Sequence, residues 1–198
     1  MNKDKALESV NEIKELMEKS SKFTSISGVT AIMAGVYALA GAYYVAYYLV
    51  TSARLIDDIK NMSIIASLVF TAAAVTAIVL SYYKSRKTGV RFFSRLTYRA
   101  LWHFSLPMLA GGALCISMLL HEYYGILSSA MLLIYGLALV NASKYTYDSM
   151  AWLGYAFIGL GIIDCFFDGH GLLFWTIGFG GFHILYGILF YLYYERNK

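Results

Sequence analysis

Apolar residues fill six long blocks of the chain, and short polar segments separate them. A helix that crosses a bilayer needs about 20 mostly apolar residues. The pattern therefore predicts six transmembrane helices, at about residues 26–50, 62–83, 100–120, 124–142, 149–167 and 172–194. Only a few residues connect the third block to the fourth and the fifth block to the sixth. We therefore expect each of these two pairs to form a tight antiparallel hairpin.

The first two dozen residues show a different pattern, in which apolar positions recur three and four apart. On a helix over residues 2–22 they form one stripe, which consists of Ala6, Val10, Ile13 and Met17. The first 22 residues hold five acidic and five basic side chains. A helix that binds anionic lipid is basic on its polar face. The stripe is therefore expected to dock on the protein's own cytoplasmic loops, on a partner protein or on a second copy of the chain.

Composition supports a membrane protein. Hydrophobic residues make up 59% of the chain and charged residues 14%, whereas a soluble domain has about 25% charged residues. The fold class is predicted to be all-α: a cytoplasmic amphipathic helix over residues 1–23, then a polytopic transmembrane bundle over residues 24–198. The first apolar block follows a polar segment and is expected to be a retained anchor rather than a cleaved signal peptide.

The distribution of lysine and arginine predicts the orientation. With the N-terminus inside, fourteen of the sixteen basic residues fall in the cytoplasmic segments 1–25, 84–99, 143–148 and 195–198, and only Arg54 and Lys60 lie outside. Cytoplasmic segments of membrane proteins are enriched in basic residues. We therefore expect both termini in the cytoplasm and a location in the cell (inner) membrane.

The segment after the second block is the most basic part of the chain. Such side chains contact anionic lipid headgroups, at about 1 kcal/mol for each one near the surface. The candidates for lipid contact are Lys84, Arg86, Lys87, Arg91 and Arg95. The same charges also fix the topology, and both roles are compatible.

Small residues recur on one face of the first block. The stripe consists of Gly28, Ala31, Gly35, Ala38 and Ala42. Helices in lipid associate through small residues that let their backbones approach, so close packing is favoured over a hinge role. A weak internal echo pairs Tyr135-Gly136 with Tyr186-Gly187, which is compatible with a duplicated helix pair.

Ionisable residues are few inside the apolar blocks. One candidate cluster lies at the outer ends of the third and fifth blocks and comprises His121, Glu122, Asp164, Asp168 and His170. If these two helices are neighbours, imidazole and carboxylate groups meet at one depth, as a divalent metal such as zinc or iron requires. A proton relay and a hydrogen-bonded polar cap are the alternatives. The spacings match no metal motif, so the cap is favoured and no cofactor is predicted.

His183 lies near the middle of the sixth block. A histidine inside a helix bundle more often makes an interhelical hydrogen bond than it binds a ligand. Together with Asp164 it also defines a hypothetical ion or proton path.

The chain contains no motif for soluble catalysis, neither a nucleophile elbow nor a phosphate-binding or dinucleotide-binding loop. The favoured hypothesis is a non-enzymatic membrane protein with a sensory, regulatory or assembly role. A small transporter or channel, and a protein with an outer-facing metal site, are the alternatives. The net charge of +4 follows from membrane topology, and no nucleic-acid partner is expected.

The N-terminal region resembles a group of small uncharacterised bacterial membrane proteins. The resemblance rests on residues 1–10, MNKDKALESV, on residues 17–23, MEKSSKF, and on the pair Ser27-Gly28. Proteins of this group are often encoded beside a small winged-helix regulator, which implies a cytoplasmic partner for residues 2–22. The resemblance covers about the first 35 residues and implies no activity or site residue.

Overall fold

The computed structural model describes residues 26–51, 55–89 and 92–196, with side chains described over 26–47, 61–89 and 92–196. Within these ranges the chain forms helices and connecting turns, and no strand. The amphipathic helix predicted over residues 2–22 and the basic residue Arg91 lie outside the described residues.

Over the described residues, five helices precede a long composite one. They are α2 (Gly28–Thr51), α3 (Leu55–Thr88), α4 (Arg95–Leu120), α5 (Leu127–Ser143) and α6 (Ser149–Asp164). The composite helix runs over Gly171–Glu195 and joins α7 (Gly171–Trp175), the π-helical η1 (Thr176–Phe182), α8 (His183–Phe190) and the π-helical η2 (Tyr191–Glu195). Each of the six predicted apolar blocks therefore corresponds to a helix.

Several helices start or end away from the predicted bounds. The second predicted block begins at residue 62, but α3 begins at Leu55, and α4 begins at Arg95 rather than at residue 100. The Ser94 hydroxyl caps α4 by accepting a hydrogen bond from the Thr97 backbone N–H at 3.2 Å. Polar residues continue these helices beyond their apolar part, because capping rather than hydropathy determines where a helix begins.

In the part of the chain that the structure describes, four helical stretches are long and apolar enough to cross a membrane. They are Gly28–Tyr47, Asn61–Thr88, Arg95–Leu120 and Gly171–Glu195. The other two helices, α5 and α6, have 17 and 16 residues, which corresponds to about 26 and 24 Å at 1.5 Å per residue. A hydrocarbon core is about 30 Å thick, so this pair is shorter than a bilayer is thick.

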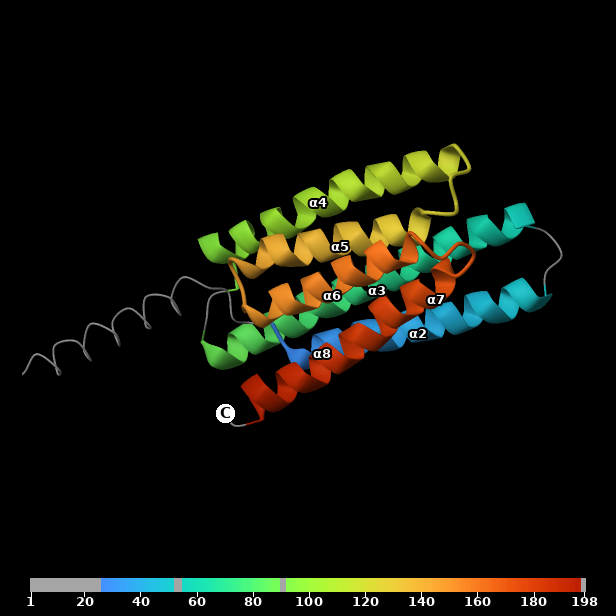
Figure 1. Ribbon diagram of the computed structural model, residues 1–198. Coiled ribbons are helices and arrows are strands. Elements are labelled where there is room, and N and C mark those ends of the chain that lie inside the picture. Colours follow the sequence, from blue (N-terminus) through green and yellow to red (C-terminus); the bar gives the residue numbers. More distant parts are fainter. Residues whose placement is uncertain (1–25, 52–54, 90–91, 197–198) are drawn as a thin grey trace, which may run out of the picture.

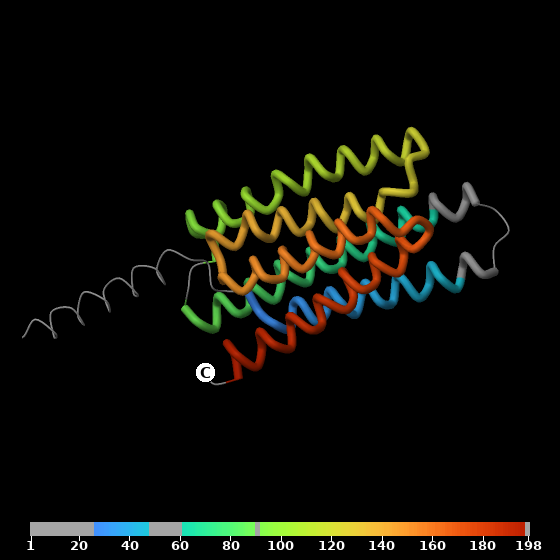
Figure 2. The backbone as a smooth tube through the Cα atoms, in the orientation of Figure 1, coloured from blue at the N-terminus to red at the C-terminus, as the bar shows by residue number. Residues whose placement is uncertain are grey.

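The helices pack in the sequence α4 on α5, α5 on α6, α6 on the composite helix, the composite helix on α2, and α2 on α3. Figure 1 shows α4 at one edge of the bundle, next to α5. Helix α3 packs mainly on α2, and α4 packs mainly on α5. The chain runs up and down through the bundle (Figure 2). One end, which we name the Lys84 end, holds the α5–α6 turn and the end of the composite helix. The opposite end, the His121 end, holds the α4–α5 and α6–α7 turns.

Glycines hold two pairs of helices at backbone contact. A Cβ atom built at Gly136 of α5 would lie 2.7 Å from the Gly154 carbonyl oxygen of α6, and one at Gly154 would lie 2.8 Å from the Gly136 oxygen. The same reciprocal contact joins Gly28 of α2 to Gly187 of the composite helix, at 2.5 and 2.6 Å. These distances confirm that Gly28, the first residue of the predicted small-residue stripe, serves close packing between helices.

A small core lies between α5, α6 and the composite helix. Its fully packed side chains are Leu132, Leu139, Leu153 and Phe157. Aromatic rings of the composite helix, including Phe179 and Phe182, pack against this group. The core therefore packs the composite helix against the α5–α6 pair that Gly136 and Gly154 hold together.

We expect the two glycines of α6 at positions 154 and 159 to respond oppositely to alanine. Gly154→Ala places a methyl group against the Gly136 carbonyl and Val140, so α5 and α6 must separate, at a cost of about 1–3 kcal/mol. A Cβ at Gly159 meets nothing within 4 Å. Gly159→Ala should therefore be neutral, or stabilise by up to about 1 kcal/mol, because alanine favours helix over glycine. Thermal unfolding in detergent measures both, and equal shifts would contradict the packing role.

Candidate functional site

Among the polar contacts between the described helices, three groups contain a residue predicted from the sequence, namely His183, Asp164 or Lys84. The first lies in the core and joins α5 to α8. The second lies near the His121 end and joins α5 to α6. The third lies at the Lys84 end and joins α3 to the start of α2 and the end of the composite helix. Each group has its own hydrogen-bond partners, so each is described separately.

The first group is a hydrogen-bonded pair, Tyr135 and His183. The Tyr135 hydroxyl lies 2.7 Å from Nε2 of His183, whose residue is 6% exposed. The ring of Phe157 lies 5.3 Å from the imidazole, and Phe179 stacks nearly parallel to it. The pair is therefore enclosed by aromatic rings rather than by water.

The other ring nitrogen of His183, Nδ1, is buried and makes no hydrogen bond. The contact with the Tyr135 hydroxyl is therefore the hydrogen bond that holds the imidazole in place.

His183 directly follows the π-helical segment η1. A π-helical segment is wider than an α-turn and is rare outside functional or strained positions. Within η1, a Cβ at Gly178 would lie 2.6 Å from Leu132 and 3.1 Å from Phe157. Glycine at this position lets the wide turn pack directly on the core beside the Tyr135–His183 pair.

The second group centres on Asp164, the last residue of α6. Its carboxyl group is buried at 4% exposure. The hydroxyls of Ser128 and Ser129 donate to the same oxygen, Oδ2, at 2.6 and 2.9 Å. Both serines lie in the first turn of α5, whose N-cap residue Ile126 supplies no side-chain cap. Asp164 thus brings negative charge to the positive end of the α5 dipole.

The structure does not gather the five residues of the predicted outer cluster. The cluster depends on contact between the third and fifth predicted helices, but α5 lies between α4 and α6 (Figure 1). Nδ1 of His121 is bonded to the Ser117 carbonyl at 2.8 Å, and Nδ1 of His170 to the Asp168 carbonyl at 2.9 Å. Both histidines are exposed. Glu122, with φ of 61°, takes the left-handed conformation that turns the chain after α4.

No metal-ligand set is formed by the described residues: among them, no three or more histidine, cysteine, aspartate and glutamate side chains come together in a way suited to a metal ion. The outer cluster is thus divided into one buried carboxyl group, Asp164, and several exposed turn residues.

The third group is an ion pair, Lys84 and Glu195, whose Nζ and Oε1 atoms lie 2.5 Å apart. The Lys84 ammonium also donates to the Ile26 carbonyl at 2.5 Å. Glu195 in turn accepts from the Ser27 hydroxyl at 3.2 Å and from the Gly28 N–H at 3.4 Å. Glu195 therefore caps the N-terminus of α2, and Lys84 neutralises the cap.

An aromatic cluster packs beside this ion pair. Lys84 Nζ lies 5.8 Å from the centre of the Phe190 ring. Phe190 in turn contacts Tyr147 in the α5–α6 turn and Tyr194, with ring centres 4.8 Å away in both cases. Burial, followed by the Glu195 carboxylate and Tyr194, raises the pKa of Tyr147. This tyrosine therefore stays neutral at physiological pH.

Lys84 thus differs from the other predicted lipid contacts. Its side chain is 23% exposed and lies inside the bundle end, whereas Arg86, Lys87 and Arg95 are exposed. The difference follows from helix geometry, because residues two positions apart on an α-helix, such as Lys84 and Arg86, point in directions about 200° apart. A run of basic residues along the sequence therefore points to several faces of α3.

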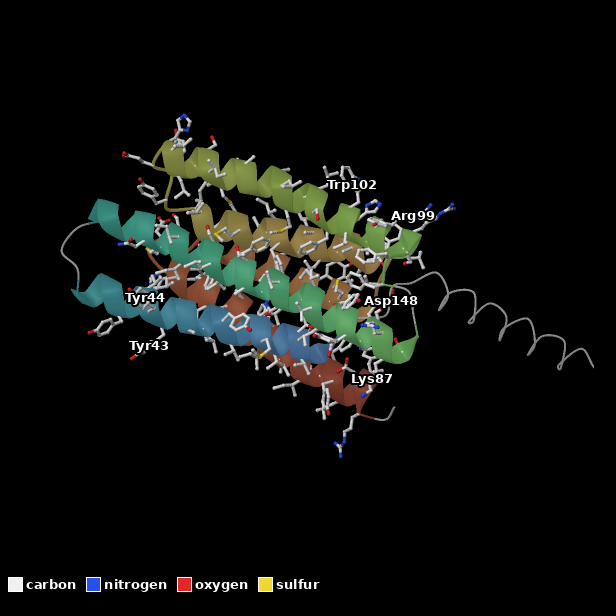
Figure 3. All side chains as sticks on the ribbon, turned by 180° about the vertical axis from the view of Figure 1, so that it is seen from behind. Tyr43, Tyr44, Lys87, Arg99, Trp102 and Asp148 are labelled. Atoms are coloured by element: carbon white, nitrogen blue, oxygen red, sulfur yellow. The ribbon has the colours of Figure 1, made fainter. Side chains whose placement is uncertain are left out.

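The two ends of the bundle carry different surface side chains. Lys87 and Arg99 lie at the Lys84 end, while Tyr43 and Tyr44 lie toward the opposite end of α2 (Figure 3). Both tyrosines are exposed. Exposed Trp102 lies at the Lys84 end as well (Figure 3), so aromatic rings occur toward both ends of the bundle, as in the aromatic belts of proteins that cross a bilayer.

The sequence analysis did not predict the residues that bond these side chains: Ser128 and Ser129 for Asp164, Tyr135 for His183, and Glu195 for Lys84. The two serines and Tyr135 stand out in the sequence as polar groups within an apolar block. Which residues they bond depends on which helices are neighbours, and the sequence does not give that.

No protein-family model matches the chain, and comparisons with curated proteins and with solved structures find no match. The function must therefore be argued from the residues alone.

We expect Lys84→Met to destabilise the protein and the neighbouring Lys87→Met to leave its stability unchanged. Removing Lys84 leaves the Glu195 carboxylate, 14% exposed, without its ion pair. Breaking a fully buried pair costs about 3–5 kcal/mol, so this partly exposed one should cost about 1–2 kcal/mol. Thermal unfolding in detergent measures the loss. Equal stability of the two variants would assign Lys84 to the lipid surface instead.

Proposed function

We propose that this chain is a six-pass protein of the bacterial inner membrane, with both termini in the cytoplasm, and that it has a non-enzymatic regulatory, sensory or assembly role. In this proposal the bundle anchors and orients residues 2–22, whose apolar stripe binds a protein partner. The main support is that His183, Asp164 and Lys84, the interior polar residues predicted from the sequence, are each bonded to a neighbouring helix. Bonds of this kind hold helices together, as in a protein that serves as an anchor.

The joint at the start of α2 supports this role. Residues 1–25 lead directly into Ile26, Ser27 and Gly28, which are bonded to Lys84 and Glu195. A segment that leaves the bundle at such a joint has a fixed point of exit. A partner bound to residues 2–22 would therefore be held at a defined place on the membrane surface.

The positions of charges and aromatic rings support six passes with the Lys84 end inside. Exposed Arg86, Lys87, Arg95 and Lys144 belong to that end, as the positive-inside rule requires. Exposed aromatic residues follow α6, at Phe166 and Phe167, and they extend the apolar length of the α5–α6 pair. A remaining mismatch of a few Å costs only fractions of a kcal/mol per Å.

A transport path through Asp164 and His183 has less support. Their partners on α5, Ser129 and Tyr135, are six residues apart, which is about 9 Å along the axis. Leu132, fully buried, lies between them on the same helix. The two polar groups are thus separated by packed apolar atoms, which favours independent local roles. An outer metal site also has less support, because His121 and His170 are each bonded to a nearby carbonyl.

Thiol labelling of the α5–α6 turn tests the number of passes. In a Cys115→Ala/Cys165→Ala background, Lys144→Cys should react with a membrane-impermeant maleimide only after the membrane is permeabilised. Native Cys165, exposed just after α6, should react in intact cells when Cys115 alone is replaced. Labelling of Lys144→Cys in intact cells would mean that α5 and α6 do not cross the membrane and that only four helices do.

Removing residues 2–22 tests the partner. We expect the truncated protein to insert normally and to lose a specific protein that the full chain captures after crosslinking in cells. Because the stripe carries the contact, Ile13→Asp should have the same effect, and Asn11→Asp, off the stripe, should not. Recovery of the same proteins from all four forms would contradict the proposed role while leaving the six-pass topology intact.

A further inference from the structure

Helix α4 lies at the edge of the bundle and packs mainly on α5 (Figure 1). Its buried residues include Ala100 and Gly111. A Cβ atom built at Gly111 would contact the side chain of Ile134 on α5. The side of α4 that faces away from α5 is therefore open to whatever surrounds the bundle.

This open side of α4 carries a row of exposed side chains that change in character along the helix. Residues three and four positions apart share one face of a helix, and this spacing joins Arg95, Arg99, Trp102, Leu106 and Leu109. Both arginines are exposed, and the exposed fractions are 63% for Trp102, 52% for Leu106 and 70% for Leu109. The row thus begins with two cations, continues with an indole ring and ends with two aliphatic side chains.

The order of these groups matches the depth profile of one membrane leaflet. Arg99 and Leu109 are ten residues apart, which corresponds to about 15 Å along the helix axis. Half of a hydrocarbon core about 30 Å thick has the same length. Indole rings prefer the level of the headgroups, and Trp102 lies next to Arg99 along α4 (Figure 3). A lipid with its phosphate beside the arginines would therefore lay an acyl chain along the leucines.

The protein supplies no negative charge to the two arginines. Neither Arg95 nor Arg99 forms an ion pair with a described residue. The sequence between Asp58 and Glu122 contains no acidic residue. A guanidinium group can bind a phosphate through two parallel hydrogen bonds, and clusters of basic side chains at a membrane surface bind anionic headgroups. An anionic phospholipid thus brings the charge that this face lacks.

The same arginines disfavour a second copy of the chain as the occupant. A two-fold contact pairs a surface patch with the identical patch of the other copy. Two copies in one membrane that met through this face would therefore bring their arginines together, and like charges repel. A lipid has no such conflict.

We propose that this face, which we name the Arg95–Leu109 face, binds an anionic phospholipid of the leaflet at the Lys84 end. The phosphate group lies beside the two arginines, and an acyl chain lies along Trp102 and the two leucines. The site does not depend on the partner-binding role proposed for residues 2–22. It also differs from the lipid contact predicted from the sequence, because it includes Arg99 and excludes Lys84, whose ammonium group is bonded inside the bundle end.

Trp102 provides a probe for this lipid. The chain has three tryptophans, so Trp152→Phe and Trp175→Phe in the full chain leave Trp102 as the one that fluoresces. This protein is reconstituted into vesicles of phosphatidylglycerol and phosphatidylcholine in equal amounts. In one set the phosphatidylglycerol chains carry bromine, which quenches indole fluorescence on contact, and in the other set the phosphatidylcholine chains carry it. Brominated phosphatidylglycerol should quench Trp102 more strongly, with a preference of at least about threefold in the relative binding constant.

Two double variants separate a site from general surface charge. Arg95→Gln/Arg99→Gln should abolish the preference for phosphatidylglycerol, and both side chains are exposed, so the fold should not depend on them. Arg86→Gln/Lys87→Gln is the matched control, because it removes two exposed positive charges at the same end of the bundle, but from α3. The control should keep the preference.

Three results would overturn the proposal. Equal quenching of Trp102 by the two brominated lipids would mean that this face does not select a charged headgroup. An equal loss of preference in the two double variants would assign the selection to the overall surface charge. Weak quenching by both lipids would mean that a protein, rather than lipid, covers this face of α4.

Discussion

Backbone contact at glycines holds α5 against α6 and α2 against the composite helix. Lipid tails solvate apolar side chains as well as another helix does, so helix association depends on close packing and polar contacts. Gly136 with Gly154, and Gly28 with Gly187, bring carbonyl oxygens within reach of the opposite backbone. Side-chain hydrogen bonds span only about 3 Å, so those that join the same helices depend on this approach. The Asp164–serine group, which joins α5 to α6, therefore depends on the Gly136–Gly154 contact.

The two Tyr-Gly pairs of the sequence play parallel parts in this packing. Gly136 and Gly187 each make a backbone contact with another helix. The tyrosine that precedes each of them makes a polar contact close by: Tyr135 bonds His183 at 2.7 Å, and Tyr186 bonds Ser149 at 3.1 Å. In both pairs the glycine contacts the backbone of one neighbouring helix, and the tyrosine before it makes a hydrogen bond to a different helix. The weak repeat in the sequence thus has a physical counterpart, whatever its origin.

The helices could be predicted from the sequence because the hydropathy of each segment, taken by itself, shows whether that segment forms an apolar helix. The packing role of Gly28 followed as well, since small residues at helical spacing have few other uses in lipid. The polar groups could not be predicted in the same way. Asp164 and His121 lie at similar places in their blocks, and only the position of α5 between α4 and α6 separates them. Lys84 looks like Lys87 in the sequence, but the turn of the helix directs it toward Glu195.

The capping of α2 by Glu195 has a consequence for how the protein is made. A ribosome synthesises α2 first among the described helices and Glu195 only after all the others, so the start of α2 enters the membrane without its cap. Lys84 likewise has no ion-pair partner until Glu195, at the end of the composite helix, has been synthesised. An unfinished or truncated chain would expose an uncompensated ammonium group and free backbone N–H groups at one end of the bundle. Membrane proteases that survey newly inserted proteins could distinguish finished from unfinished copies by this feature alone.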